Sequence, residues 1–112
     1  MALRDVFSLL DKYGATRALE RLANPGPAVA VQVSMMERRS DEAPLMGDVS
    51  QYDLQFYVRH DSLAAAGFPV PPLKGDRVHD GTIPRIYTIR SVEDMHDQQG
   101  RVGGYRLWAR GH

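Results

Sequence analysis

Residues 71–111, PPLKGDRVHDGTIPRIYTIRSVEDMHDQQGRVGGYRLWARG, decide the fold, because they predict strands joined by turns and leave no room for a helix. Short strands are expected where β-branched and aromatic residues gather, at Arg77–His79, Tyr87–Val92 and Tyr105–Arg110. Turn residues separate them, namely Lys74-Gly75-Asp76, Asp80-Gly81 and the glycine-rich run Gly100–Gly104. This third of the chain therefore predicts a small β-domain that works through its surfaces.

The N-terminal half predicts one amphipathic helix and two further strands. Apolar residues recur at helical spacing over Leu3–Lys12, and Gly14 follows at a position suited to a helix C-cap. Apolar and polar residues alternate over residues 29–35 and 52–58, which is the period of a strand with one buried face. The helix is expected outside or at one end of a β-core built from Leu22, Val29, Val31, Val33, Leu54, Phe56, Val58, Ile89 and Leu107.

Three other segments complete the pattern. Over Thr16–Ala23 the good helix formers Ala, Leu, Glu and Arg favour more helix, and a strand there would go against propensity. Asp61 is expected to cap a helical turn, Ser62–Ala66, that Gly67 ends. Residues 37–52 have no hydrophobic period and more acidic than basic side chains, so they predict a long acidic loop of the kind that is usually functional or disordered.

Composition narrows the functional classes. The 112 residues predict one domain, and 14 basic and 14 acidic side chains give a formal net charge of +0. This balance argues against a role on nucleic acid, where neutralising phosphate supplies most of the affinity. The absence of cysteine excludes disulfides and thiolate metal sites. Neither a secretory signal nor an apolar run long enough to span a membrane is found, so a cytoplasm is the expected compartment.

No catalytic, cofactor-binding or metal-binding residue is predicted. Three His-Asp dipeptides occur, His60-Asp61, His79-Asp80 and His96-Asp97, each at a predicted strand end or turn. Adjacent strand residues point to opposite faces, so one pair cannot readily hold a single ion. Gly100–Gly104 lacks the following helix that a phosphate-binding loop needs. Because no nucleophile–base arrangement is evident either, we expect that the chain is not an enzyme and carries no cofactor.

The last strand offers a candidate interface. Alternation puts Arg106, Trp108 and Arg110 on one face of that strand and Tyr105, Leu107 and Ala109 on the other. Arginine and tryptophan are enriched among the residues that anchor protein interfaces. The same pattern also fits a solvated strand face on which a loop covers part of Trp108, and the sequence leaves both interpretations open.

Four segments carry a resemblance to a known family: residues 59–69, RHDSLAAAGFP; residues 72–78, PLKGDRV; residues 87–92, YTIRSV; and residues 104–111, GYRLWARG. In this order they resemble the small head–tail joining proteins of tailed bacteriophages, also called head-completion or stopper proteins, which occur in prophages and gene transfer agents. The resemblance implies a small antiparallel β-barrel with helical additions. It also implies that Thr16–Ala23 is a strand, since pairing within a sheet can override propensity.

The resemblance further implies a structural protein of the virion neck, made in the cytoplasm of a host bacterium. Under this resemblance the protein is expected to bind copies of itself in a homo-oligomeric ring of about twelve subunits. Its other expected partners are a portal or connector adaptor protein and a tail or tail-terminator protein. Packaged DNA is expected to lie nearby, and no membrane is involved. The acidic loop is expected to become ordered on assembly. Its candidate contact residues are Arg38, Arg39, Asp41, Glu42, Leu45, Met46 and Asp48. The alternative is a generic β-barrel protein-binding module in a bacterial complex.

Overall fold

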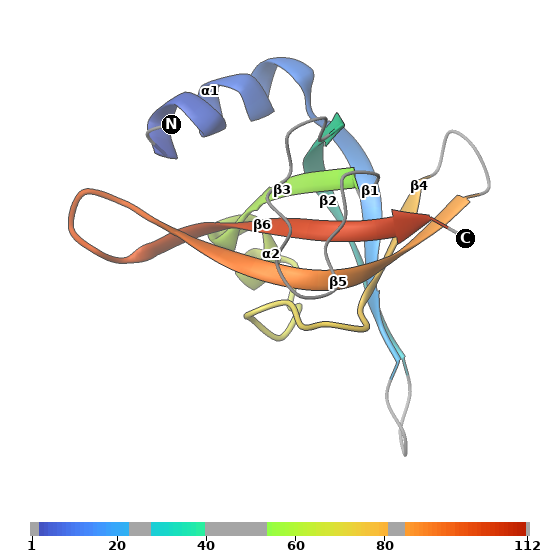
Figure 1. Cartoon of the computed structure of the whole chain (residues 1–112). Helices are drawn as coiled ribbons and strands as arrows, with labels where there is room; N and C mark the ends of the chain where they lie inside the picture. The colour runs from blue at the N-terminus through green and yellow to red at the C-terminus, as the bar shows by residue number, and fades with distance from the viewer. Residues whose placement is uncertain (1–2, 23–27, 40–53, 81–84, 112) are drawn as a thin grey trace.

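The computed structural model describes residues 3–22, 28–39, 54–80 and 85–111 (Figure 1). Six antiparallel strands close into a barrel in the order β1-β2-β3-β6-β5-β4. The strands are β1 Ala15–Arg21, β2 Val29–Arg39, β3 Leu54–Arg59, β4 Arg77–Asp80, β5 Arg85–His96 and β6 Val102–Gly111. Two helices accompany them, α1 Leu3–Tyr13 and α2 His60–Ala65. The predicted antiparallel β-barrel with an N-terminal helix and a short helical turn is confirmed.

The β5–β6 hairpin is longer than the sequence predicted and projects beyond the barrel (Figure 1). Its strands pair as far as His96 and Val102, so Gly103 and Gly104 belong to β6 rather than to the turn predicted over Gly100–Gly104. Asp97 builds the turn: its Oδ1 accepts the backbone N–H groups of Gln99 and Arg101, each at 2.9 Å. Gly100 completes the turn at a φ of +80°, a conformation that glycine adopts without steric cost.

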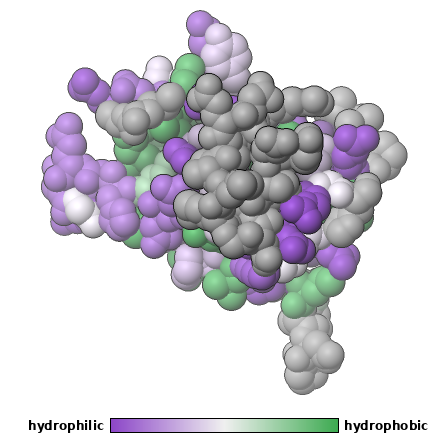
Figure 2. All heavy atoms as spheres, viewed as in Figure 1, coloured by the Kyte–Doolittle hydropathy of each residue, from purple (hydrophilic) through white to green (hydrophobic). Residues whose placement is uncertain are grey.

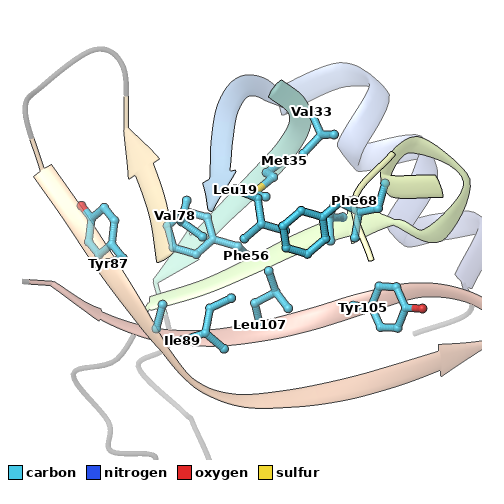
Figure 3. Packing of buried hydrophobic residues seen from close by; sticks show 13 residues of the cluster. Leu19, Val33, Met35, Phe56, Phe68, Val78, Tyr87, Ile89, Tyr105 and Leu107 are labelled. Carbon is cyan, nitrogen blue, oxygen red and sulfur yellow. The ribbon is translucent and has the colours of Figure 1, made fainter. Parts of the chain in front are cut away.

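The core fills the barrel with aliphatic and aromatic side chains around Phe56 (Figure 3). Of the predicted core residues, five are buried, namely Val33, Phe56, Val58, Ile89 and Leu107. Three more, Val29, Val31 and Leu54, are half-buried against them. The prediction for Leu22 is wrong, because 55% of that residue is exposed. Leu22 lies one residue past the end of β1, and the alternation that directs Leu19 and Arg21 to the core gives position 22 the opposite face.

The strand interpretation of Thr16–Ala23 is correct over Ala15–Arg21, and the helical expectation from propensity is wrong; Ala23 lies outside the described residues. Leu19 is fully buried, and its neighbours two residues away, Arg17 and Arg21, stack over core aromatic rings. The core-facing positions of β1 are therefore arginine, leucine and arginine. Charged residues at two of three core-facing positions conceal the period of two that would have indicated a strand.

Helix α1 packs on the outside of the barrel, as predicted. Its buried residues Val6 and Leu10 form a second apolar cluster with Met36 of β2 and Tyr57 of β3. The helix ends at Tyr13, and the backbone N–H of Gly14 donates to the carbonyl of Leu10 at 2.7 Å. Neither α1 nor α2, the two helices in the described part of the chain, is long and apolar enough to cross a membrane.

Helix α2 differs from its prediction at the start and agrees with it at the end. It begins at His60, so Asp61 lies inside the first turn, and Arg59 precedes the helix without a side-chain cap. The predicted Asp61 cap is thus wrong. Gly67 ends the helix at a φ of +84°, and the N–H of Phe68 donates to the carbonyl of Leu63 at 3.0 Å. This closing bond agrees with the predicted glycine stop.

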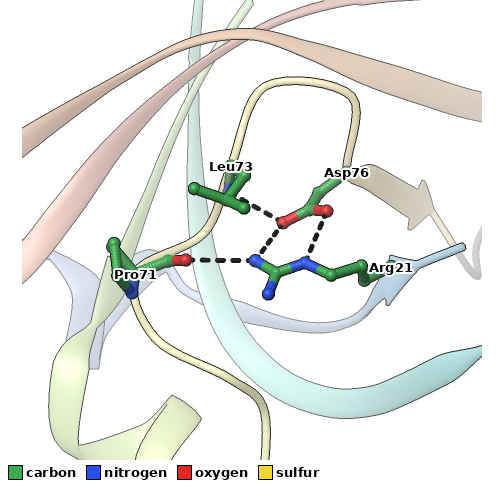
Figure 4. Close-up of polar contacts among 4 residues, drawn as sticks. All are labelled: Arg21, Pro71, Leu73 and Asp76. Atoms are coloured by element: carbon green, nitrogen blue, oxygen red, sulfur yellow. Dashed lines mark hydrogen bonds and ion pairs between the residues drawn. The ribbon is translucent and has the colours of Figure 1, made fainter. Parts of the chain in front are cut away.

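An ion pair fastens the segment between α2 and β4 to the barrel (Figure 4). Arg21 at the end of β1 donates two hydrogen bonds to the carboxylate of Asp76 and a third to the carbonyl of Pro71. Asp76 also accepts the backbone N–H of Leu73 at 2.8 Å. Just before Asp76, Gly75 takes a φ of +98°, in the turn that the sequence predicted at Lys74-Gly75-Asp76.

Candidate interaction surface

The candidate surface divides into a described part and a part outside the described residues. The predicted acidic loop begins later than expected, because β2 continues to Arg39 and includes Glu37 and Arg38. The remainder of the loop lies outside the described residues, and with it the candidate contact residues Asp41, Glu42, Leu45, Met46 and Asp48. Gly81 of the predicted Asp80-Gly81 turn also lies outside the described residues. The structure therefore bears on Arg38, Arg106, Trp108 and Arg110, and on the backbone of Arg39.

Cross-strand pairing brings Arg38, Arg106 and Trp108 to one outer face of the barrel. One row of facing residues runs across four strands, from Arg38 through Gln55 and Trp108 to Ser91. The adjacent row runs from Met36 through Tyr57 and Arg106 to Glu93. Residues directly opposite on neighbouring strands project from the same face, so the two rows form one continuous surface. Arg110 faces Thr88 on the same side of β6.

Trp108 is not an exposed anchor, because only 2% of it is accessible. Its cross-strand neighbour Gln55 is also buried, at 7%. The indole N–H of Trp108 has no hydrogen-bond partner among the described residues. The exposed side chains of this face are charged and include Arg38, Arg110 and Glu93. A partner that met this face would meet charged side chains, two of them arginines, rather than an aromatic side chain.

Arg106 lies between two aromatic rings and an acidic side chain. Its guanidinium carbon is 5.3 Å from the centre of the Tyr57 ring and 5.9 Å from that of Trp108, within range of cation–π attraction. Its Nη1 is 3.2 Å from a carboxylate oxygen of Glu93. Arg106 thus connects β3, β5 and β6 through these contacts. Only 29% of its side chain is exposed and its charge is paired with Glu93, so Arg106 offers little free charge to a partner.

The three His-Asp dipeptides lie on different elements and serve different contacts. His60 begins α2, where its Nδ1 is 2.7 Å from the hydroxyl of Tyr105. His79, on β4, places Nε2 3.2 Å from the carboxylate of Glu20. His96 ends β5, next to the turn residue Asp97. Within the described ranges, no group of three or more histidine, aspartate or glutamate side chains could hold a metal ion.

Burial and charge perturb one titratable group of this region. Tyr105 is 3% exposed and lies in the core cluster, and burial raises the pKa of its hydroxyl above the ordinary value of 10.0. The negative charge of Asp94, its cross-strand neighbour on β5, raises that pKa further. Tyr105 therefore stays protonated at neutral pH and links α2 to β6 through its hydrogen bond with His60.

A groove of about 530 Å³ lies between the start of α1 and the tip of the β5–β6 hairpin. Leu3 and Phe7 supply apolar walls, and polar side chains complete it, namely Arg4, His96, Asp97, Gln98 and Gln99. In Figure 2 hydrophilic residues dominate the projecting hairpin. This groove was not predicted from the sequence. The paired glycines Gly103 and Gly104, which were predicted to belong to a turn, are a sequence signal that another element approaches β6 closely.

No protein-family model matches this chain, and no curated protein matches it significantly.

Proposed function

We propose that this chain is a head–tail joining protein of the neck of a tailed bacteriophage or gene transfer agent. In this role it forms a homo-oligomeric ring of about twelve copies below the portal and its connector adaptor. The ring helps to retain packaged DNA and offers a docking surface to a tail or tail-terminator protein. The chain acts as a structural component and catalyses no reaction.

The architecture carries this proposal. The resemblance of the four sequence segments implies a small antiparallel β-barrel with helical additions, and the chain folds into a closed six-stranded antiparallel barrel with α1 packed outside it. The resemblance also implies a strand at Thr16–Ala23, against helix propensity, and β1 occupies most of that stretch. A fold can host many functions, so this agreement supports the proposal and does not replace its test.

The charge pattern is compatible with a protein that surrounds DNA without binding it tightly. The formal net charge is +0, so the whole molecule has no general attraction for phosphate. Many arginines instead contact the protein itself: Arg17, Arg21, Arg59 and Arg106 each lie over an aromatic ring and near a carboxylate. A ring subunit would keep the exposed Arg38 available for a neighbouring subunit or adaptor.

Deletion of the coding gene from its phage or prophage tests this function. Induced cells should then release heads without tails, and expression of the wild-type chain should restore tail-bearing particles, counted by electron microscopy. Mass spectrometry should find the chain in purified wild-type particles. Normal tail-bearing particles without the chain would overturn the proposal, and recovery of the chain in a cellular complex instead would favour the protein-binding module.

Two charge reversals then test the surface. Arg38→Glu reverses an exposed charge on the arginine-bearing outer face, and Lys12→Glu reverses an exposed charge on α1 as a matched control. Both variants should melt like the wild type, because exposed substitutions usually change stability little. Only Arg38→Glu should lower the yield of tail-bearing particles. Equal yields from both variants would remove Arg38 from the proposed interface.

A further inference from the structure

The projecting part of β5 has one strand edge with no hydrogen-bonded partner among the residues that the structure describes. β5 pairs with β4 only over Arg85–Thr88, and the next residue, Ile89, exchanges backbone hydrogen bonds with Gly75 and Asp76. Beyond the bulge that follows Ile89, residues 91–96 pair with β6 alone. Among the described residues, none donates a hydrogen bond to the other edge of this segment or accepts one from it.

An open edge of this kind is a template for another strand. Alternate residues of an antiparallel strand direct their N–H and C=O groups away from the paired neighbour. A row of such groups binds an extended polypeptide through main-chain hydrogen bonds, as in recognition by strand addition. The segment is accessible for this purpose, since Glu93, Asp94 and His96 are exposed. A closed barrel removes strand edges where neighbouring strands pair, and this hairpin extends past the point of closure.

Charge on the edge selects what can bind there. Glu93 is paired with Arg106, whereas the carboxylate of Asp94 has no hydrogen bond or ion pair with any described residue. The negative charge of Asp94 acts on its surroundings, since it contributes to the raised pKa of the neighbouring Tyr105. Opposite charges on neighbouring strands stabilise pairing, and like charges facing each other destabilise it. The edge therefore favours a strand with lysine or arginine beside Asp94.

The same charge argues against a second copy of this chain as the occupant. Two β5 edges that paired with each other in antiparallel fashion would bring Glu93 and Asp94 of both copies close together. Acidic residues on an exposed edge are one of the devices by which proteins prevent such self-pairing. The occupant is thus expected to be a segment of a different protein.

We propose that the free edge of β5, residues 91–96, binds an extended basic segment of a partner protein by antiparallel or parallel strand addition. The backbone supplies the affinity, and Asp94 supplies the preference for a lysine or arginine side chain. This proposal stands whether or not the chain is a neck protein, because it rests only on the pairing of β5 and on the unpaired carboxylate.

Nuclear magnetic resonance of the full chain with two synthetic peptides tests the proposal. The probe is acetyl-Thr-Val-Lys-Val-Thr-Val-Lys-Thr-amide, and the matched control has glutamate at both lysine positions. The lysine peptide should shift the backbone amide signals of residues 91–96 in a saturable manner and slow their hydrogen exchange. Its affinity should exceed that of the glutamate peptide by roughly three- to tenfold, the range expected when a cross-strand attraction becomes a repulsion.

A charge reversal in the protein separates the edge from other acidic sites. Asp94→Lys should reverse the preference between the two peptides, while Asp5→Lys, which changes an exposed acidic residue on α1, should leave it unchanged. Because both residues are exposed, neither substitution should disturb the core. Unchanged amide signals from core residues would verify that each variant is folded. Saturable shifts outside residues 91–96, equal affinities for the two peptides, or no binding by either would overturn the proposal.

Discussion

The guanidinium of Arg21 holds the carboxylate of Asp76 by two hydrogen bonds, Nε to Oδ1 at 3.0 Å and Nη2 to Oδ2 at 2.9 Å (Figure 4). Only 4% of the Asp76 side chain is exposed, against 22% of that of Arg21. The two residues are separated by 55 positions in the sequence. Their contact ties the last residue of β1 to the residue that precedes β4, the two strands that close the barrel.

Replacing Asp76 by alanine should destabilise the fold by about 2–3 kcal/mol. Removing one partner of a buried pair typically costs about 3–5 kcal/mol, and the partial exposure of Arg21 lets water compensate some of that loss. The backbone N–H of Leu73 also loses its acceptor. Equilibrium unfolding in urea measures the effect. Arg21→Lys, which keeps the charge but cannot form the two parallel bonds, should cost less, and an Asp76→Ala variant as stable as the wild type would refute this role.

The core assignment predicts a sharp contrast between two apolar residues. Phe56 is fully buried, with its ring centre 5.3 Å from that of Tyr87, so Phe56→Ala should cost about 3–5 kcal/mol. Leu22→Ala removes an aliphatic side chain that is 55% exposed and should change stability by less than about 0.5 kcal/mol. Thermal or urea unfolding of both variants measures the difference. Similar losses for the two would contradict the arrangement of the core.

These pairs of residues also show what the sequence could predict. The strands around Phe56 and Val58 follow a clear alternation, and the turns at Gly75 and Gly100 need a backbone conformation that glycine adopts readily, so sequence patterns were sufficient there. β1 was different, because its core-facing arginines are stabilised by Asp76 and by aromatic rings that lie far away in the sequence. Such long-range compensation leaves no local pattern, and only the resemblance to a family indicated a strand.

The candidate surface was predictable to a similar degree. Alternation correctly placed Arg106, Trp108 and Arg110 on one face of β6, since the pleat alone fixes that relationship. It could not reveal that Trp108 is buried or that Arg106 is paired with Glu93, because both depend on neighbouring strands. The open edge of β5 could not be predicted from the sequence for the same reason. Its length becomes evident only when the pairing of β4 and β6 with β5 is known.

The contact between α1 and β6 depends on glycine at position 103. A Cβ atom there would overlap Cδ2 of Leu3. Gly103→Ala should therefore destabilise the protein by about 1 kcal/mol, at the lower end of the cost of overpacking, because the obstacle is the end of a flexible side chain. In a Leu3→Ala background the same substitution should cost less. A double-mutant cycle from urea unfolding measures the coupling, and strictly additive losses would exclude this contact.

The raised pKa of Tyr105 predicts a loss of stability in alkaline solution. The unfolded chain releases this proton near the ordinary pKa of 10.0, whereas burial and the charge of Asp94 delay its release in the folded protein. Above about pH 10 the folded state thus binds more protons than the unfolded state, and the free energy of unfolding falls as pH rises towards the folded pKa. Below that range this contribution is complete and independent of pH.

Urea unfolding at pH 8, 10 and 11 compares the wild type with Tyr105→Phe. The variant loses the hydrogen bond to His60 and should be less stable than the wild type by about 1 kcal/mol at pH 8. Its stability should then fall less steeply between pH 10 and pH 11, because it has no hydroxyl at this position to titrate. The difference between the two proteins should narrow as pH rises. A difference that stayed constant across this range would show that ionisation of Tyr105 is not linked to folding.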